Sequence, residues 1–353
     1  MAFQTINQVA VSGIAAAVPR NVVENSSCGL FASQEEYARF ATMVGIERRH
    51  ICEEGVIASD LCAGAAEKLL EDLSWRREDI DLLIYVSQTM EYKLPATACC
   101  LQHRLGMSRD CMCFDVGMGC SGWVYGMGIA AGMIQTGHFR RCLLLAGDSH
   151  LANGQSKAET PLFGDCGTAT ALSFDPTSPP ILIETGTDGS GYDAIICKSF
   201  VGGGSRYPCS ENSFEWRTDE FGNKYRDVDI VMNGPAVFTF GITRVPACVR
   251  RMLQRAEKGV EDIDSFVFHQ ANLMMNEMIR KKCKIPVEKC PYSLRNFGNC
   301  SSASIPLTLV SQLAGGIRQH PVSLLACGFG VGLSWGTLHT TLKQPVISDL
   351  VYL

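Results

Sequence analysis

The sequence predicts an α/β protein built from two duplicated halves, with helices covering both faces of each sheet. Two observations support this prediction. The segment EDIDLLIYVS, from Glu78 to Ser87, resembles EDIDSFVFHQ, from Glu261 to Gln270, about half the chain further on. Short, continuously apolar strands alternate with helical stretches in both halves, which is typical of sheets buried on both sides. A long repeat in which the order of elements also matches indicates duplication.

The predicted elements follow the same order in each half. Apolar runs of strand length and longer helical patterns alternate along the first half, and the second half repeats this order up to a glycine-rich connection between its last two strands. In the first half we expect strands at 81–86, 111–116, 141–146 and 168–174 and helices at 97–105 and 120–136; in the second, helices at 235–257, 273–282 and 302–313 and strands at 265–268, 322–326 and 333–341.

The chain is therefore divided into an N-terminal half, residues 1–184, and a C-terminal half, residues 185–353. The second half begins with residues 185–230, which are rich in Gly, Ser, Tyr and charge and lack a clear period. This stretch is too long for a simple connection, so we expect an irregular insertion with a functional role.

Composition excludes several classes of protein. Hydrophobic residues make up 46% of the chain and charged residues 19%, which fits a large buried core and excludes disorder. The net charge of −5 argues against a nucleic-acid-binding protein. The low charged fraction favours a surface that is partly buried in an oligomer, and the resemblance described below implies a homodimer.

The longest apolar stretch, from Val116 to Ile134, contains Cys120, Ser121 and several glycines. We interpret it as a buried helix with its entry loop and not as a membrane span. The first residues lack the basic start and apolar core of a secretory signal, so we expect a cytoplasmic protein.

The 17 cysteines are scattered, without a CxxC pair or a zinc-type Cys/His spacing. We therefore expect no metal site, and most of these cysteines are expected to be small core residues. One cysteine has chemically distinctive surroundings. Cys120 follows a strand and a Gly117–Gly119 turn and is expected to open a helix, where the helix N-terminus favours the nucleophilic thiolate.

Two further positions are candidates for chemistry. His269 stands at the end of an apolar strand, where open α/β sheets carry their functional groups. Asn299 lies in a loop of small polar residues before a helix. Taken singly, each has an ordinary structural interpretation: a packed cysteine, a hydrogen-bonded core histidine and a helix-capping loop.

Together with their flanking motifs, these residues resemble the β-ketoacyl-acyl-carrier-protein synthase III family of the thiolase superfamily, over nearly the whole chain. Six segments carry the resemblance, in order: GIERRH (45–50), DVGMGCSGW (115–123), FGDCGTA (163–169), HQAN (269–272), GNCSSASIP (298–306) and GFGVGLSWG (328–336).

The resemblance implies a thiolase fold, a five-layered αβαβα sandwich of duplicated halves. It also implies a catalytic set of Cys120, His269 and Asn299 and a decarboxylative condensation without a metal or redox cofactor. An acyl primer carried on coenzyme A is transferred to Cys120 as a thioester. Malonyl-acyl carrier protein then loses CO2, and the enolate accepts hydrogen bonds from His269 Nε2–H and the Asn299 amide.

The resemblance also implies residues around the substrate. The oxyanion of the condensation step is placed at the backbone N–H groups of Cys120 and Val331. Asn272, Leu94 and Trp123 are further candidates for substrate binding, and Leu94 stands where a larger aromatic side chain closes the acyl pocket of the partner subunit. Because Leu94, Trp123 and Val331 depart from the usual family pattern, the primer is expected to differ from acetyl.

Another departure concerns the carrier protein. The family commonly has an Arg at the position of Met274 for carrier docking. A basic run follows on the same predicted helix and is expected to replace that contact, since positive patches steer acidic partners. The run consists of Arg280, Lys281, Lys282 and Lys284.

Four other functions are weighed from the sequence alone. The same Cys-His fold can form an ester or amide without decarboxylation, or serve a specialised-metabolite pathway. A non-catalytic subunit is disfavoured by the intact Cys-His-Asn set. A hydrolase, suggested by the strand–turn–helix around Cys120, gives Asn299 no task.

Overall fold

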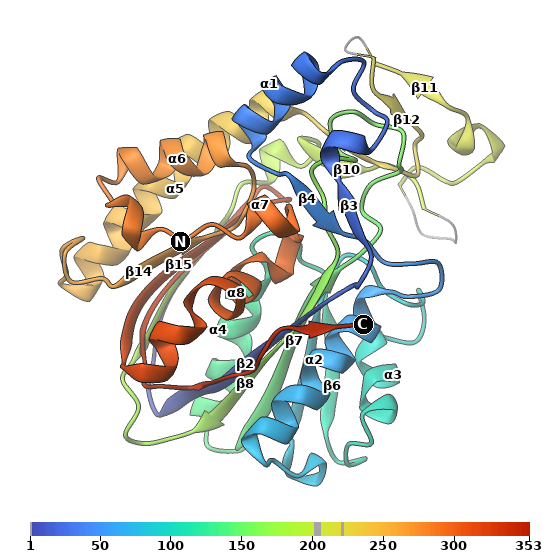
Figure 1. The fold of residues 1–353 in the computed structure, drawn as a ribbon. Helices are drawn as coiled ribbons and strands as arrows, with labels where there is room; N and C mark the ends of the chain where they lie inside the picture. The colour runs from blue at the N-terminus through green and yellow to red at the C-terminus, as the bar shows by residue number, and fades with distance from the viewer. Residues whose placement is uncertain (1, 201–205, 220–221) are drawn as a thin grey trace.

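Two sheets and three layers of helices make up the computed structural model, which describes residues 2–200, 206–219 and 222–353. Helices lie outside each sheet and between the two sheets (Figure 1). This gives the five layers α, β, α, β, α.

The first sheet is formed mainly by the N-terminal half. Its parallel core pairs β5 with both β6 and β7. Strand β8 lies antiparallel to both β7 and β2, and β17 and β18 pair with β2 in parallel. Its strands, in spatial order, are β17 (Val346–Ile347), β2 (Val9–Val18), β8 (Cys166–Phe174), β7 (Arg141–Asp148), β5 (Leu82–Val86) and β6 (Met112–Val116), with β18 (Val351–Tyr352) also paired to β2.

The second sheet is formed mainly by the C-terminal half. Its parallel pair is β14 and β15, and β16 returns antiparallel from β15. Its strands, in spatial order, are β1 (Ala2–Ile6), β9 (Ile181–Thr187), β16 (Ser334–Leu342), β15 (Val322–Gly330) and β14 (Ser265–Phe268).

Each helix layer has its own apolar core. Helices α2 (Ala58–Leu73) and α3 (Thr97–Arg104) cover the outer face of the first sheet. Helices α5 (Gly234–Ala256) and α6 (Leu273–Lys282) cover the outer face of the second. The central layer is α4 (Gly122–Gln135) and α8 (Ser304–Gln319), and their side chains share one core with both sheets.

The central helices approach the sheets closely because their contact faces carry small residues. A Cβ on Gly126 of α4 would lie 2.6 Å from a Leu144 methyl group of β7. The glycines of the 116–134 segment therefore serve packing between two sheets, and the stretch is a buried helix as predicted. Among the residues described, no helix combines the length and hydropathy needed to cross a bilayer.

The duplication is visible in the order of the strands. The first sheet contains the run β2-β8-β7-β5, and the second contains β9-β16-β15-β14 in the corresponding positions. The repeated EDID segments lead into β5 and β14. The two sheets also exchange terminal strands, since β1 joins the second sheet and β17 and β18 join the first. The predicted boundary between residues 184 and 185 falls inside β9.

The remaining elements lie at the end of the sandwich where the parallel strands terminate (Figure 1). They include helix α1 (Gln34–Val44), helix α7 (Leu294–Phe297) and the short pair β3 (Val22–Glu24) and β4 (Arg48–His50). In the described part of the predicted insertion, β10 (Ile195–Cys197) pairs with β13 (Ile230–Met232), and β11 (Arg217–Thr218) pairs with β12 (Lys224–Tyr225).

Candidate active site

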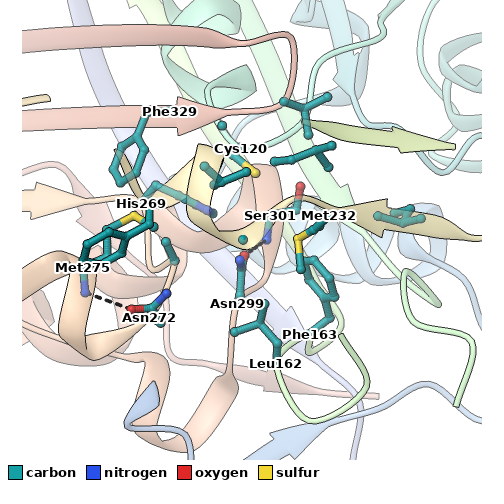
Figure 2. A pocket seen from close by; sticks show the side chains of 18 of the residues that line it. Cys120, Leu162, Phe163, Met232, His269, Asn272, Met275, Asn299, Ser301 and Phe329 are labelled. Carbon is teal, nitrogen blue, oxygen red and sulfur yellow. Dashed lines mark hydrogen bonds between the residues drawn. The ribbon is translucent and has the colours of Figure 1, made fainter. Parts of the chain in front are cut away.

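Cys120, His269 and Asn299 line one cavity of about 390 Å³. The three side chains come from different loops and converge in the close view of this cavity (Figure 2). All three are buried, with exposed fractions of 8%, 2% and 5%. The walls are mostly apolar, so an ionised group there has little water around it.

Cys120 lies in the turn between β6 and α4. The turn is closed by a hydrogen bond from Gly122 N to Gly119 O of 2.6 Å, and α4 begins at Gly122. The predicted strand, turn and helix are therefore present, but the helix starts two residues later than expected. Cys120 precedes the helix and does not open it.

A glycine-rich strand end presses directly on this turn. A Cβ on Gly330 would lie 2.7 Å from Cys120 Cβ and 2.8 Å from Sγ, and Gly330 has a φ of 155°. A Cβ on Gly328 would lie 2.8 Å from Cys120 O. Only glycine allows β15 to approach this closely, and the approach brings the Val331 N–H to the sulfur of Cys120.

His269 directly follows β14, at the carboxyl end of the parallel pair β14–β15. Its Nδ1 lies 2.8 Å from Ser304 Oγ. The single hydroxyl proton of Ser304 is already donated to Ser301 O at 2.9 Å, so Nδ1–H must be the donor to Ser304. In neutral His269 the other ring nitrogen, Nε2, therefore carries a lone pair and is a proton acceptor.

Asn299 is oriented by a hydrogen bond to its acceptor atom, whereas His269 is oriented by a hydrogen bond from its donor nitrogen. Its Oδ1 accepts a hydrogen bond from Ser301 N at 2.9 Å. A backbone N–H can only donate, so the assignment of the amide oxygen is unambiguous, and the Nδ2 hydrogens are left for the cavity. Asn299 thus supplies donors where His269 supplies an acceptor.

Burial dominates the ionisation of the Cys-His pair. It raises the pKa of Cys120 to about 11, although hydrogen bonds from the Val331 N–H and the Ser301 hydroxyl favour the thiolate. It also lowers the pKa of His269 to about 3. Backbone N–H groups at the start of the helix do favour the thiolate, as expected, but desolvation outweighs them, so the pKa of Cys120 is raised overall.

Two of the quoted motifs support the Asn299 loop, and one of them also contributes to the cavity wall. Phe163 of FGDCGTA lines the cavity and forms a backbone bridge with Asn299. Arg49 of GIERRH is buried and donates to Phe163 O at 3.1 Å and to Asn25 Oδ1 at 2.8 Å. Its role in this structure is to hold the 163 loop.

The other predicted substrate residues divide into two groups. Asn272 and Val331 line the cavity, and Asn272 also caps α6 through a bond from Met275 N of 2.8 Å. Trp123 and Leu94 are not among the lining residues. Trp123 is 2% exposed in the core and donates to Thr170 Oγ1, so the structure gives it a packing role instead of direct substrate contact. Leu94 is 83% exposed on the surface.

The predicted basic run is only partly available to a partner. Arg280 forms two bonds of 2.7 Å to Glu277 and a third to Ile285 O, so its charge is used within the helix and its surroundings. Lys282 donates to Ile242 O at 2.9 Å. Lys281 lies 3.8 Å from Glu277 Oε2 but its side chain is 70% exposed, and Lys284 is also exposed. Met274, at the mouth-forming end of the same helix, is 44% exposed and lines the cavity.

One group of side chains has the composition of a metal site, although sequence spacing did not suggest it. Potential ligand atoms of Cys52, His150 and Asp165 lie within 4.8 Å of one another. Both oxygens of Asp165 already accept backbone N–H groups, from Cys52 at 2.8 Å and His150 at 3.0 Å. These bonds explain the cluster as a brace between two loops.

The sequence analysis missed part of the cavity wall and one polar neighbour of Cys120. Ile195, Ile230 and Met232 of the β10–β13 pair line the cavity, so the predicted insertion forms one of its sides. Ser301 also lines it, with its side chain directed toward Cys120 (Figure 2). The serine-rich run after Asn299 was the only signal for Ser301.

Comparisons with known proteins match the same regions. The sequence model of the 3-oxoacyl-[acyl-carrier-protein] synthase III family matches residues 114–189, which contain Cys120. The family model of the C-terminal part of this synthase matches residues 253–342, which contain His269 and Asn299. The chain is 31% identical over 334 residues to a β-ketoacyl-[acyl-carrier-protein] synthase III of Geobacillus kaustophilus, covering 93% of this chain and 97% of the relative. The chain belongs to this synthase III family. It is therefore an acyltransferase of the condensing type.

Solved structures of the family share the fold from end to end. A 3-oxoacyl-(acyl-carrier protein) synthase from Burkholderia xenovorans is 32% identical, with a TM-score of 0.92 over 100% of this chain and 99% of that one. A synthase III from Pseudomonas aeruginosa is 26% identical, with a TM-score of 0.81 over 97% and 100%. The predicted thiolase fold is confirmed.

The raised pKa of Cys120 predicts how the free thiol reacts with iodoacetamide. Only the thiolate reacts, and below a pKa of about 11 its fraction grows tenfold with each pH unit. Alkylation of Cys120 should therefore accelerate by about a hundredfold between pH 7 and pH 9, without a plateau. Peptide mass spectrometry separates Cys120 from the other cysteines. A rate that levels off below pH 9 would show that the thiolate is favoured after all.

Proposed function

We propose that this family member transfers an acyl primer from coenzyme A to Cys120 and condenses it decarboxylatively with malonyl-acyl carrier protein. The products are β-ketoacyl-acyl carrier protein, CO2 and free coenzyme A. The observation that carries the proposal is the convergence of one thiol, one acceptor nitrogen and one pair of amide donors in a single buried cavity. Each has a separate task in the two half-reactions.

In the acylation step, Nε2 of His269 accepts the Cys120 proton as the sulfur attacks the primer thioester. The oxyanion of the tetrahedral intermediate lies against the N–H groups of Cys120 and Val331, which already face the sulfur. Collapse of the intermediate leaves the acyl group on Cys120. The departing coenzyme A thiolate takes the proton from Nε2, which restores neutral His269.

In the condensation step, malonyl loses CO2 and its thioester oxygen becomes an enolate. The Nδ2 hydrogens of Asn299 are oriented to bind that oxygen, because Oδ1 is held by Ser301. The enolate carbon attacks the acyl carbonyl on Cys120 and the C–S bond breaks. The released thiolate takes up a proton from solvent by way of Nε2 of His269, which replaces the proton that left with coenzyme A. Because Nε2 of resting His269 is an acceptor, we assign stabilisation of the enolate to Asn299. His269 takes part in both half-reactions through proton transfer to and from Cys120.

The carrier protein is expected to dock beside α6. Lys281 and Lys284 are exposed at the C-terminal end of this helix, whose N-terminal end borders the cavity mouth. Lys282 lies eight positions after Met274 on this helix, a distance of about 12 Å along the axis. Arg280 is left out of the proposed docking surface because Glu277 neutralises it.

A homodimer is proposed from the free edge of the first sheet. In the described chain, β6 pairs only with β5, and its residues Met112 to Val116 are all at least partly exposed. The nearby loop exposes Met90, Tyr92 and Leu94. An apolar edge strand beside exposed apolar side chains favours pairing with a second copy.

We also propose a cytoplasmic location. All 17 cysteines are free thiols, including the exposed Cys99 and Cys197. A reducing compartment keeps such a chain in this state.

The two half-reactions separate the roles of the three residues. Cys120→Ala should abolish the covalent acyl adduct formed with acyl-coenzyme A, as measured by intact-protein mass spectrometry against a panel of primers. Asn299→Ala should lower malonyl decarboxylation by roughly a hundredfold while sparing acylation, because one oxyanion donor is lost. His269→Ala should lower both. An adduct that persists in Cys120→Ala, or equal losses of both half-reactions in Asn299→Ala, would contradict the assignment.

Charge reversal tests carrier docking. Lys281→Glu with Lys284→Glu should raise KM for malonyl-acyl carrier protein by roughly tenfold at low salt, and less at high salt where charges are screened. Acylation from coenzyme A should change less. The matched control is Arg77→Glu with Arg109→Glu, two exposed cations near the starts of β5 and β6, at the opposite end of the strands. If both pairs of substitutions raise KM equally, the effect comes from the net charge of the protein and not from a docking surface on α6.

Leu94→Asp tests the dimer without disturbing the core, because Leu94 is 83% exposed. The wild-type chain should sediment at twice its 38.4 kDa mass, and the variant should shift toward the monomer. Val287→Asp serves as the control, since Val287 is also well exposed, at 61%, but lies away from this edge. A wild-type monomer at micromolar concentration would rule out the dimer.

A further inference from the structure

A buried carboxylate lies behind the catalytic cavity with no cation paired to it. Asp148 ends β7 and is 0% exposed. In the described chain no salt bridge to it is found within 4.0 Å, and burial raises the pKa of its carboxyl group. A buried charge without a counterion is costly unless hydrogen bonds replace the lost water, so the partners of Asp148 explain its presence.

The two oxygens of Asp148 serve two different loops. Oδ1 accepts from Gln88 N at 2.8 Å and from Ser87 Oγ at 3.1 Å, in the loop after β5. Oδ2 accepts from Ser302 Oγ at 2.9 Å and from Ser302 N at 3.3 Å. The first loop belongs to the N-terminal half and the second to the C-terminal half, and Gln88 and Ser301 both line the catalytic cavity. Asp148 therefore joins the two halves at the site.

The turn that Asp148 holds is the one that orients both polar catalytic side chains. Ser301 N fixes the Asn299 amide, and Ser301 O receives the Ser304 hydroxyl that in turn accepts from His269. Ser301 has a φ of 45°, a left-handed conformation that is unfavourable for a residue other than glycine. Such a conformation persists only when neighbouring contacts enforce it. Asp148 supplies such contacts through its bonds to Ser302 and to the Ser301 side chain.

We propose that Asp148 is a positioning residue: its carboxylate holds the Ser301–Ser304 turn and thereby sets Asn299 and His269 for the decarboxylation step. The proposal rests on the proposed condensing function. It predicts that the effect of Asp148 passes through Ser301 and Ser302. The loss should be larger for decarboxylation, which needs both Asn299 and His269, than for acylation, which needs His269 but also depends on Cys120 and its two N–H groups.

The electrostatics give a second consequence. His269, from the end of β14, lines the same cavity as Cys120, and Asp148 acts on Cys120 through its charge. The negative charge of Asp148 raises the pKa of Cys120. Removing that charge should therefore move the alkylation profile of Cys120 to lower pH, an effect that a purely structural residue would not produce.

Asp148→Asn is the decisive variant. An amide accepts hydrogen bonds on one atom only and places an NH2 group opposite one of the two loops, so one set of bonds is lost. Decarboxylation of malonyl should fall by roughly tenfold or more, with a smaller loss of acylation, because small misplacements of catalytic groups cost large factors in rate. The iodoacetamide profile of Cys120 should shift to lower pH.

Ser302→Ala is the milder companion, because it removes one donor to Asp148 and keeps the charge. It should reduce decarboxylation in the same direction, and the double variant should cost less than the product of the two single effects. Asp81→Asn is the matched control: Asp81 accepts from Arg140 N and Arg141 N at the other end of β7, and its loss should leave the ratio of the half-reactions unchanged.

Thermal melting of each variant shows whether it is folded, so that a lost activity is not mistaken for unfolding. If Asp148→Asn folds poorly, Ser302→Ala carries the ratio measurement. An unchanged ratio in both variants, independent effects in the double variant, or an unmoved alkylation profile would overturn the proposal. If wild-type protein itself forms no acyl adduct, the condensing function fails separately, and the alkylation profile of Asp148→Asn then decides on Asp148 alone.

Discussion

The contact between the Cys120 turn and the end of β15 is the constraint on which the site depends. The turn belongs to one half of the duplicated fold and the strand to the other, and they touch through Gly328 and Gly330, where a side chain would collide with Cys120. Ser121 and Ser334 add a hydrogen bond of 2.7 Å across the same junction. The thiol, its N–H donors and the loops that carry His269 and Asn299 are assembled by this contact. Each half alone holds only part of the chemistry.

The resulting site is buried, and its reacting groups are uncharged at rest. Desolvation keeps both Cys120 and His269 neutral at rest, so charge appears only as the reaction proceeds. In such surroundings fixed hydrogen-bond donors stabilise a developing oxyanion more strongly than water-exposed ones would. The direction of each polar group is correspondingly important: the Nε2 lone pair of His269 and the Nδ2 hydrogens of Asn299 are both set by bonds made on the opposite side of the residue.

Irregular segments of the chain line the part of the cavity that is expected to hold the substrate. The β10–β13 pair of the insertion forms one wall of the cavity, and the N-terminal ends of α5 and α6 supply Pro235, Val237 and Met274 nearby. A rigid sandwich thus fixes the reacting groups, and irregular connections shape the space for the acyl chain and its carrier. This division is common in α/β enzymes, whose loops carry specificity.

The sequence alone determined the fold class, the duplication and the three residues of the candidate site. These follow from local information: period and apolar runs for strands and helices, and short ordered motifs for Cys120, His269 and Asn299. Element ends were shifted by a few residues, as with α4, which begins at Gly122 and not at Cys120. The roles of single residues were predicted less well from the sequence. Trp123, expected to bind substrate, packs in the core, and Arg280, expected to dock the carrier protein, is neutralised by Glu277.

Only the tertiary structure decided the protonation of the site and the residues that hold it. The pKa of Cys120 depends on how completely its surroundings exclude water, and the lone pair of His269 depends on a serine 35 positions away. Asp148 and Ser302 are 154 positions apart and share no motif, yet they bond across the junction of the two halves. Contacts of this kind depend on how the two sheets pack. Packing brings together residues that are far apart in the sequence, and the residues next to them in the sequence do not indicate which partners they will contact.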